Sequence, residues 1–224
     1  MTLTGATFLD SLETRVRICE AGRAAVGMGS TGAPERQDAY ARRLFPEAED
    51  ARTRAAMADA MYSCALHALT CYREAMLTAP ELHEPYSTHI GAAPAWLASI
   101  AQRMGAFVSL ATKAQCDAYL DASPADKSGD VLVVSEPVHV IVLTSRRDPP
   151  VEAVDAYITS EGGSPEYDAL RNEKGMCIRT RTMFLRRAGD GRIQTGSLDI
   201  NGRLTWGRVA LYAIDADKLR RDDE

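Results

Sequence analysis

The spacing of apolar residues changes near the middle of the chain, and no other feature restricts the possible folds as much. In the first half, apolar residues recur at roughly helical spacing, at Phe8, Leu9, Leu12, Val16 and Ile18. From Asp130 onward, short β-rich runs alternate with turns rich in Gly, Pro and Asp. We expect strands over 131–135, 138–145, 153–159, 176–185 and 206–214. Helices followed by an antiparallel meander predict an α+β domain, with the helical N-terminal half packed on the sheet.

Glycine and proline mark the expected ends of the first helices. The first helix should fade in the Gly-containing stretch 22–32, and a second should begin at Pro34, because proline suits the first helical position. That helix should break near Pro46. A long Ala-rich helical stretch is then expected over 48–76, with an interruption at 61–63.

A further helix is expected after Pro94, with Gly105 as its stop signal. We divide the chain into a helical N-terminal extension (1–50), an α+β domain (51–219) and a charged, frayed tail (220–224).

Composition and charge exclude several classes of partner. The 224 residues carry a net charge of −5, so we expect no binding to nucleic acid, which attracts basic surfaces. No apolar run approaches the roughly 20 residues needed to cross a bilayer, so no membrane span is expected. The first residues lack the basic start and long apolar stretch of a signal peptide. These features favour a protein that is cytoplasmic at synthesis or is exported by a specialised secretion route.

The five cysteines, at positions 19, 64, 71, 116 and 177, do not form a disulfide pattern. Their number is odd, their spacing is wide, and no CxxC motif is present, which also argues against a zinc ribbon or a thioredoxin-type centre. We expect all five to be reduced thiols and expect no cofactor.

Cys64 is the candidate nucleophile. It stands near the start of the apolar helical segment 63–69. A thiol at a helix N-terminus faces free backbone N–H groups and the positive end of the helix dipole, which favour the thiolate. The same N–H groups can stabilise an oxyanion. The alternative is core packing, because free cysteine is among the most buried residue types.

His139 is the candidate general base. It opens the expected strand 138–145 and is followed by apolar residues, among which a lone imidazole carries a cost of burial. It also follows Glu136-Pro137, an interruption of the kind found at sheet edges. The alternative is a histidine whose hydrogen bonds are satisfied in the core or at an edge.

A third group is needed to orient the imidazole. We place the hairpin after His139 so that the numbers of paired residues sum to about 296, which puts Tyr157 opposite His139 and Thr159 diagonally on the same face. Glu161 follows at the end of that strand. We predict Thr159 or Glu161 as the orienting group, whereas a slip of one residue brings in Ser160.

A metal site is the competing interpretation of the same region. Cys64, His67 and Cys71 share one helical face, and His83 or His89 would have to supply a fourth ligand. The spacing matches no common zinc pattern, so we expect no metal and expect His67 and Cys71 to pack beneath the helix.

Basic residues at 179–181 and 186–187 form a positively charged stretch on a late strand. Such a stretch is usually a solvated sheet face, and the alternative is a site that binds an acidic substrate terminus.

Three segments together resemble the NlpC-type and CHAP-type branch of the papain-like cysteine peptidases. Residues 61–66 resemble the start of that family's nucleophile helix, and 129–134 and 138–142 resemble its GD strand and the HV strand that follows. The similarity covers roughly residues 55–219 and extends to uncharacterised bacterial members with a helical N-terminal extension. It departs at Ser63, where Asp or Asn is usual.

The resemblance implies a papain-like core in which Cys64 is the nucleophile and His139 the general base. Typical members cleave peptide or amide bonds in bacterial peptidoglycan. We therefore hypothesise a thiol hydrolase acting on a peptide or a peptidoglycan fragment. The alternative is a catalytically inactive papain-like module that binds a partner or serves as a scaffold, and the oligomeric state stays open.

Overall fold

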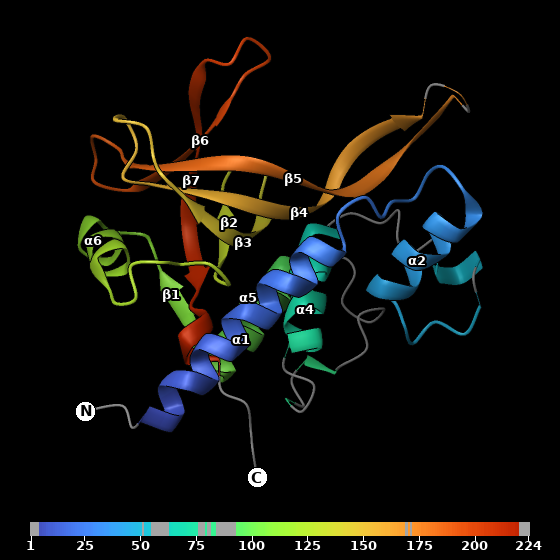
Figure 1. Ribbon diagram of the computed structural model, residues 1–224, viewed down its shortest axis with the longest axis horizontal. Helices are drawn as coiled ribbons and strands as arrows, with labels where there is room; N and C mark the ends of the chain where they lie inside the picture. The colour runs from blue at the N-terminus through green and yellow to red at the C-terminus, as the bar shows by residue number, and fades with distance from the viewer. Residues whose placement is uncertain are drawn as a thin grey trace.

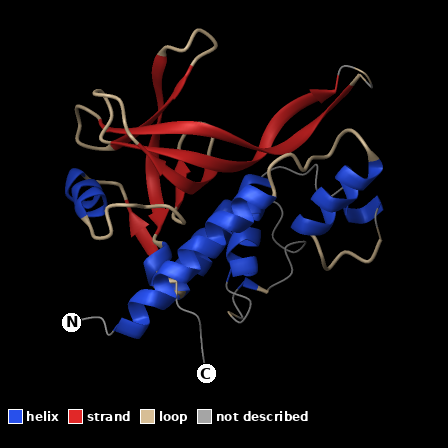
Figure 2. Cartoon of the chain, viewed as in Figure 1, coloured by secondary structure: helices blue, strands red, loops and turns tan. Residues whose placement is uncertain are grey.

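The computed structural model describes residues 5–50, 52–54, 63–75, 79, 82–83, 93–168, 170 and 172–219. Helices and strands occupy separate parts of the chain, apart from one short strand and one helix in the middle (Figure 2). The elements are α1 (Gly5–Ala24), α2 (Pro34–Leu44), α4 (Ser63–Ala75), α5 (Ala93–Arg103), β1 (Phe107–Ser109), α6 (Lys113–Asp121), β2 (Val131–Val134), β3 (His139–Arg147), β4 (Asp155–Asp168), β5 (Glu173–Arg187), β6 (Ile193–Leu198), β7 (Leu204–Ile214) and a 3-10 turn, η3 (Ala216–Lys218).

All strand pairs in the single sheet are antiparallel, in the order β1-β7-β2-β3-β4-β5-β6. The sheet closes on itself because β7 is long enough to pair with β6 through its first half and with β2 through its second half. Helices α1, α4 and α5 lie together on one side of this sheet, and α6 lies near β1 (Figure 1). The α+β class expected from the sequence is confirmed.

Both faces of the central strands are buried, which explains why their sequences are almost wholly apolar. On β3, Val140 and Val142 belong to a cluster that joins the sheet to the helices, through residues such as Leu69 on α4 and Leu97 on α5. Ile141, between the two valines, points to the opposite face.

The second cluster fills the inside of the closed sheet. It contains Leu132, Ile141 and Tyr157 from the strands, and Cys116 and Tyr119 from α6. Helix α6 therefore packs its apolar side chains against this inner face, whereas α1, α4 and α5 cover the outer one.

The helices expected at the start of the chain and near Pro94 are present as α1 and α5. Helix α2 begins at Pro34 as expected. Helix α4 begins at Ser63, the end of the expected interruption, whereas 61–62 and the tail 220–224 lie outside the described residues. The five expected strands also occur, and four of the five are longer than expected. The sequence pattern missed β1, α6 and β6. The signals of β1 and β6 are weak, since β1 has three residues and β6 contains a glycine. Helix α6 has only nine residues, but its Thr112 capping box is a signal from which its start could have been predicted.

The predicted register of the β3–β4 hairpin is wrong. Arg146 pairs with Tyr157 and Leu143 with Thr159, so paired numbers sum to about 302–303 instead of about 296. Tyr157 is therefore not opposite His139. The turn is centred later because β3 continues to Arg147 and the Pro-containing segment that follows forms the loop.

Glu161 was expected at the end of its strand, and it lies inside β4 instead. The pairing of β4 with β5 shifts between Glu161 and Ser164, and Gly163 has φ of +64°. Glycine reaches positive φ without steric cost, so the Gly pair allows a bulge here without ending the strand. The bulge immediately follows Glu161, at the point where the candidate site is formed.

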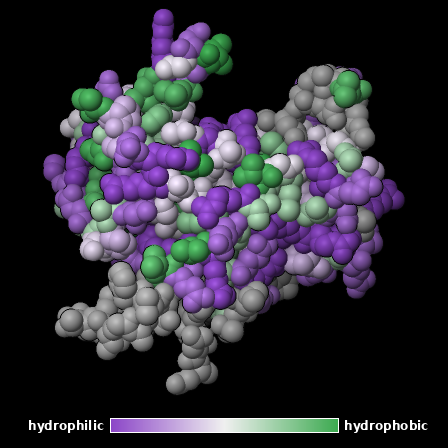
Figure 3. Space-filling model, in the orientation of Figure 1, coloured by the Kyte–Doolittle hydropathy of each residue, from purple (hydrophilic) through white to green (hydrophobic). Residues whose placement is uncertain are grey.

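The visible surface is mainly hydrophilic, with apolar side chains in small separate groups (Figure 3). The most exposed large apolar residues, Val151, Leu170 and Ile200, lie in connections between strands. In the described part of the chain, no helix combines the length and the apolar character needed to span a bilayer.

Candidate active site

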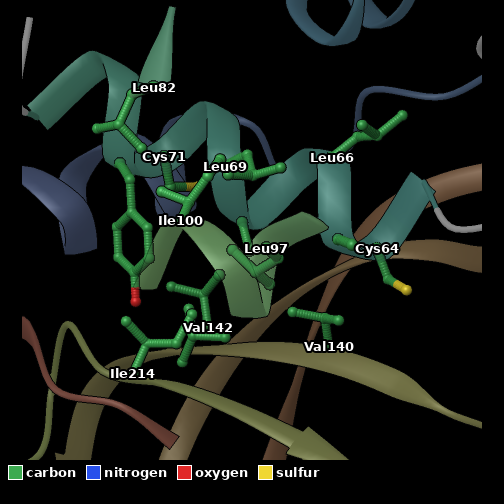
Figure 4. Close-up of a cluster of buried hydrophobic side chains, with 14 of the residues drawn as sticks. Cys64, Leu66, Leu69, Cys71, Leu82, Leu97, Ile100, Val140, Val142 and Ile214 are labelled. Atoms are coloured by element: carbon green, nitrogen blue, oxygen red, sulfur yellow. The ribbon is translucent and has the colours of Figure 1, made fainter. Parts of the chain in front are cut away.

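Cys64 lies in the first turn of α4, at the end of the helix that faces the strands (Figure 4). Its sulfur points away from the apolar side chains of the surrounding cluster, although the residue is only 6% exposed. The first backbone N–H groups of a helix have no partner within the helix and carry a partial positive charge. The thiol therefore lies at the end of α4 where these backbone N–H groups are available.

His139 is the first residue of β3 and follows the turn that contains Pro137. Its side chain is 13% exposed, and Nε2 lies 3.0 Å from Oε2 of Glu161. Because Glu161 occupies Nε2, the nitrogen left to serve the thiol is Nδ1.

Glu161 is held from three sides, and its side chain is 1% exposed. Besides the contact with His139, its Oε1 accepts a hydrogen bond from Oγ1 of Thr159 at 2.7 Å and lies 3.0 Å from Nε of Arg181. Burial raises the pKa of this carboxyl, but these partners, led by His139 and Arg181, outweigh it and hold the pKa below its usual value. Glu161 is therefore a buried carboxylate.

The imidazole of His139 is shifted toward its charged form. Burial lowers its pKa, but the interactions with the Cys64 thiol and with Glu161 outweigh that effect and raise the pKa to about 9. The imidazole thus interacts with the thiol of Cys64 and with the carboxylate of Glu161. The candidate residues Cys64, His139 and Glu161, which come from α4, β3 and β4, thus lie together.

Thr159 supports this group, whereas Ser160 has its partners on the other face of β4. The hydroxyl of Thr159 donates to Glu161 at 2.7 Å and lies 3.2 Å from the carbonyl oxygen of Arg181, so it supports the carboxylate. Ser160 points to the other face of β4, where its hydroxyl donates to the carbonyl of Gly22 and lies 2.9 Å from Nε2 of His67.

His67 and Cys71 lie on the buried face of α4 and pack beneath the helix, as expected from the sequence. Both are fully buried, and Cys71 Sγ lies 3.7 Å from Nε2 of His67. Burial lowers the pKa of His67 to about 3 and raises that of Cys71 to about 12. Among the residues that the structure describes, no group of His, Cys, Asp or Glu side chains is arranged to hold a metal ion. His83 is exposed, and His89 lies outside the described residues.

Two residues near the site were not predicted as part of it. Arg181 was noted only within a basic stretch, and its contact with Glu161 depends on the β4–β5 pairing, in which Arg181 lies opposite Thr159. Tyr212 on β7 stacks on Phe107 with ring centroids 4.9 Å apart, and its hydroxyl donates to the carbonyl of Pro94. Burial and the nearby Cys64 raise the pKa of Tyr212 to about 12. Nothing in the local sequence of Tyr212 indicates this position.

No protein-family model, curated protein or solved structure matches this chain.

Proposed function

We propose that the protein is a thiol hydrolase that cleaves a peptide or amide bond, built on a papain-like core of the NlpC and CHAP type. One observation carries the proposal. Glu161 lies 3.0 Å from Nε2 of the strand-start His139, and the helix-start Cys64 is close enough to help raise the pKa of that imidazole. Nucleophile, base and orienting group in this order are the requirement for thiol catalysis.

In the proposed reaction, the thiolate of Cys64 attacks the carbonyl carbon of the amide. The backbone N–H of Cys64, in the first turn of α4, donates to the oxyanion that forms. His139, protonated at Nδ1, gives its proton to the leaving nitrogen, so that the C–N bond breaks and a thioester remains on Cys64.

The second half of the reaction uses water. Neutral His139 takes a proton from a water molecule, and the resulting hydroxide attacks the thioester. The acyl group leaves as a carboxylic acid, and the sulfur returns to the thiolate beside the imidazolium. Glu161 stays ionised throughout and fixes the ring orientation through Nε2, with Thr159 and Arg181 holding the carboxylate.

As substrate we propose the peptide part of bacterial peptidoglycan. The support for this class is the resemblance in 61–66, 129–134 and 138–142 to enzymes that act there. A net charge of −5 is in keeping with a peptide substrate and not with an acidic polymer.

A second candidate is a catalytically inactive module that binds such a peptide. The observation in its favour is the burial of the site, because Cys64 is 6% exposed and the Glu161 side chain 1%. Reactivity of the thiol separates the two candidates.

The test is the rate of alkylation by iodoacetamide at pH 7, with each cysteine followed by peptide mass spectrometry. Cys19 is a matched internal control, since it is 5% exposed and burial raises the pKa of its thiol to about 11. We expect Cys64 to react at least about tenfold faster than Cys19, because only Cys64 faces an imidazolium.

The second measurement is release of peptide fragments from purified peptidoglycan by the wild-type protein and by Cys64→Ala. We expect turnover to be lost in the variant while its circular dichroism is unchanged. A Cys64 that reacts no faster than Cys19, together with no turnover, overturns the hydrolase and favours the binding module.

A further inference from the structure

The outer edge of β5 has a gap in its pairing. On one side of the gap, the loop before α2 covers the edge, where Gly27 donates to the carbonyl of Ile178 and Ile178 donates to that of Met28. On the other side, pairing with β6 starts only at Phe184. Along one strand, alternate residues direct their N–H and C=O groups to the same side.

The residues within this gap are Thr180 and Thr182. Because Ile178 and Phe184 use the edge away from β4, the N–H and C=O groups of Thr180 and Thr182 also point to that edge. In the described part of the chain, no backbone hydrogen bond covers them from that side. A short stretch of sheet edge with free donors and acceptors is a site to which an extended peptide can add.

A hollow lies over this gap. It has a volume of about 340 Å³, is open to solvent, and is lined by 179–182 of β5 and by Ser197 and Leu198 of β6. The β6–β7 hairpin rises away from β5 in this region (Figure 1). The hollow thus combines free backbone groups with hydroxyl side chains and one apolar side chain.

Two arginines line this hollow, and Arg179 gives it a positive charge. Arg179 and Arg181 pair with Glu161 and Thr159 respectively, so both arginine side chains lie on the face of the sheet that carries Glu161. Arg181 is engaged by Glu161 at 3.0 Å. Arg179 is exposed, and none of the described acidic side chains forms an ion pair with it. Its guanidinium is free for a carboxylate, which it can bind through two parallel hydrogen bonds.

We propose that this hollow binds an extended peptide segment that carries a free carboxylate. The segment adds to the edge of β5 through Thr180 and Thr182, and Arg179 binds the carboxylate. This inference rests on the proposed function in so far as the segment belongs to the substrate of Cys64. Arg181 joins the hollow to the catalytic group, because it lines the one and contacts Glu161 in the other.

The binding test uses the full chain with Cys64→Ala, so that binding is read without turnover. The probes are acetyl-Ala-Ala-Ala with a free C-terminal carboxylate and the same peptide with a C-terminal amide, titrated while amide NMR signals are followed. We expect the carboxylate peptide to shift the signals of Thr180 and Thr182, with the amide peptide binding about tenfold more weakly.

Arg179→Gln should lower the affinity for the carboxylate peptide to that for the amide peptide. Arg147→Gln, which removes an exposed arginine from β3, is the matched control and should leave the affinity unchanged. In the active protein, Arg179→Gln should raise KM about tenfold with kcat within about twofold. Equal affinity for the two peptides, or signal shifts only away from β5, overturns this site. Peptide binding without turnover in the wild-type protein overturns the hydrolase and leaves the site standing.

Discussion

At the scale of single residues, Glu161 is expected to set the upper pH limit of activity. The imidazolium of His139 is required to protonate the leaving nitrogen, and its pKa of about 9 depends on Glu161 and Cys64. Replacing the carboxylate removes one of the two influences that raise this pKa. In Glu161→Gln, His139 should therefore lose its proton at lower pH than in the wild type. The alkaline limb of kcat/KM should move down by about one pH unit or more, and activity at pH 7.5 should fall by about a hundredfold.

The measurement is kcat/KM from pH 5 to 10, with Thr159→Val as the control. That variant removes one hydrogen bond to Glu161 but keeps the charge, so its alkaline limb should move less than that of Glu161→Gln. An alkaline limb that is the same in Glu161→Gln and in the wild type would show that this carboxylate does not act on His139.

The residues of the site were more predictable than their arrangement. Cys64 and His139 could be predicted from residue type and from their places at element starts, which do not depend on the exact strand register. Glu161 was predicted from a register that is wrong, and it reaches His139 because β4 continues through a glycine bulge where the strand was expected to end. The contact of Arg181 with Glu161 could not be predicted, because it depends on the register of β4 with β5, which brings together residues about twenty positions apart in sequence.

At the scale of elements, His67 joins three of them and should make the fold sensitive to acid. The hydroxyl of Ser160 on β4 donates to the carbonyl of Gly22 on α1, so it accepts a hydrogen bond from Nε2 of His67 on α4. Burial, followed by the charge of Arg43, lowers the pKa of His67 to about 3 from its ordinary 6.5. The unfolded chain therefore binds a proton below pH 6.5 that the folded protein does not bind.

The neutral His67 therefore causes no loss in the free energy of unfolding above pH 6.5, and the loss grows as the pH falls from 6.5 toward 3. Between pH 7.5 and 5 the loss should be about 2 kcal/mol, and urea unfolding at the two pH values measures it. The amide of His67→Gln can still donate to Ser160 but does not titrate. The free energy of unfolding of this variant should therefore lack the loss of about 2 kcal/mol between pH 7.5 and 5 that His67 causes. His83→Gln, at an exposed position, should behave as the wild type. An equal decrease in wild type and His67→Gln would contradict a neutral buried imidazole.

The same distinction applies to whole elements. Long helices and apolar strands were predictable because their periodicity extends over many residues. The closure of the sheet was not, since it depends on both ends of β7 pairing with different strands, and β6, which completes it, carries Gly196 beside Trp206 and only a weak strand pattern.

At the scale of the whole molecule, Arg15 connects the beginning and the end of the described chain. Its guanidinium lies 2.9 Å from Asp130, which is fully buried, and contacts Asp215 and Asp217 beyond β7. Asp130 also accepts hydrogen bonds from the Tyr119 hydroxyl and from the backbone N–H of residue 216. Burial raises the pKa of Asp130 to about 6, although Arg15 opposes this.

Removing the guanidinium should therefore cost more stability at high pH than at low pH. With a folded pKa above its unfolded value, Asp130 contributes stability that is fully present below the unfolded pKa and is lost as the pH rises through about 6. Arg15→Met raises the folded pKa further, so at pH 8 it leaves a buried carboxylate without its counter-charge, at a cost of about 3–5 kcal/mol. At pH 5 the carboxyl takes up a proton, and the cost should be clearly smaller.

Urea unfolding of both proteins at pH 5 and 8 measures the difference. Arg17→Met is the control on the same helix, because its partner Glu13 is exposed and such pairs contribute little. If Arg15→Met costs the same at both pH values, Asp130 does not change its protonation, and the helix is held by packing and the remaining hydrogen bonds instead of by charge.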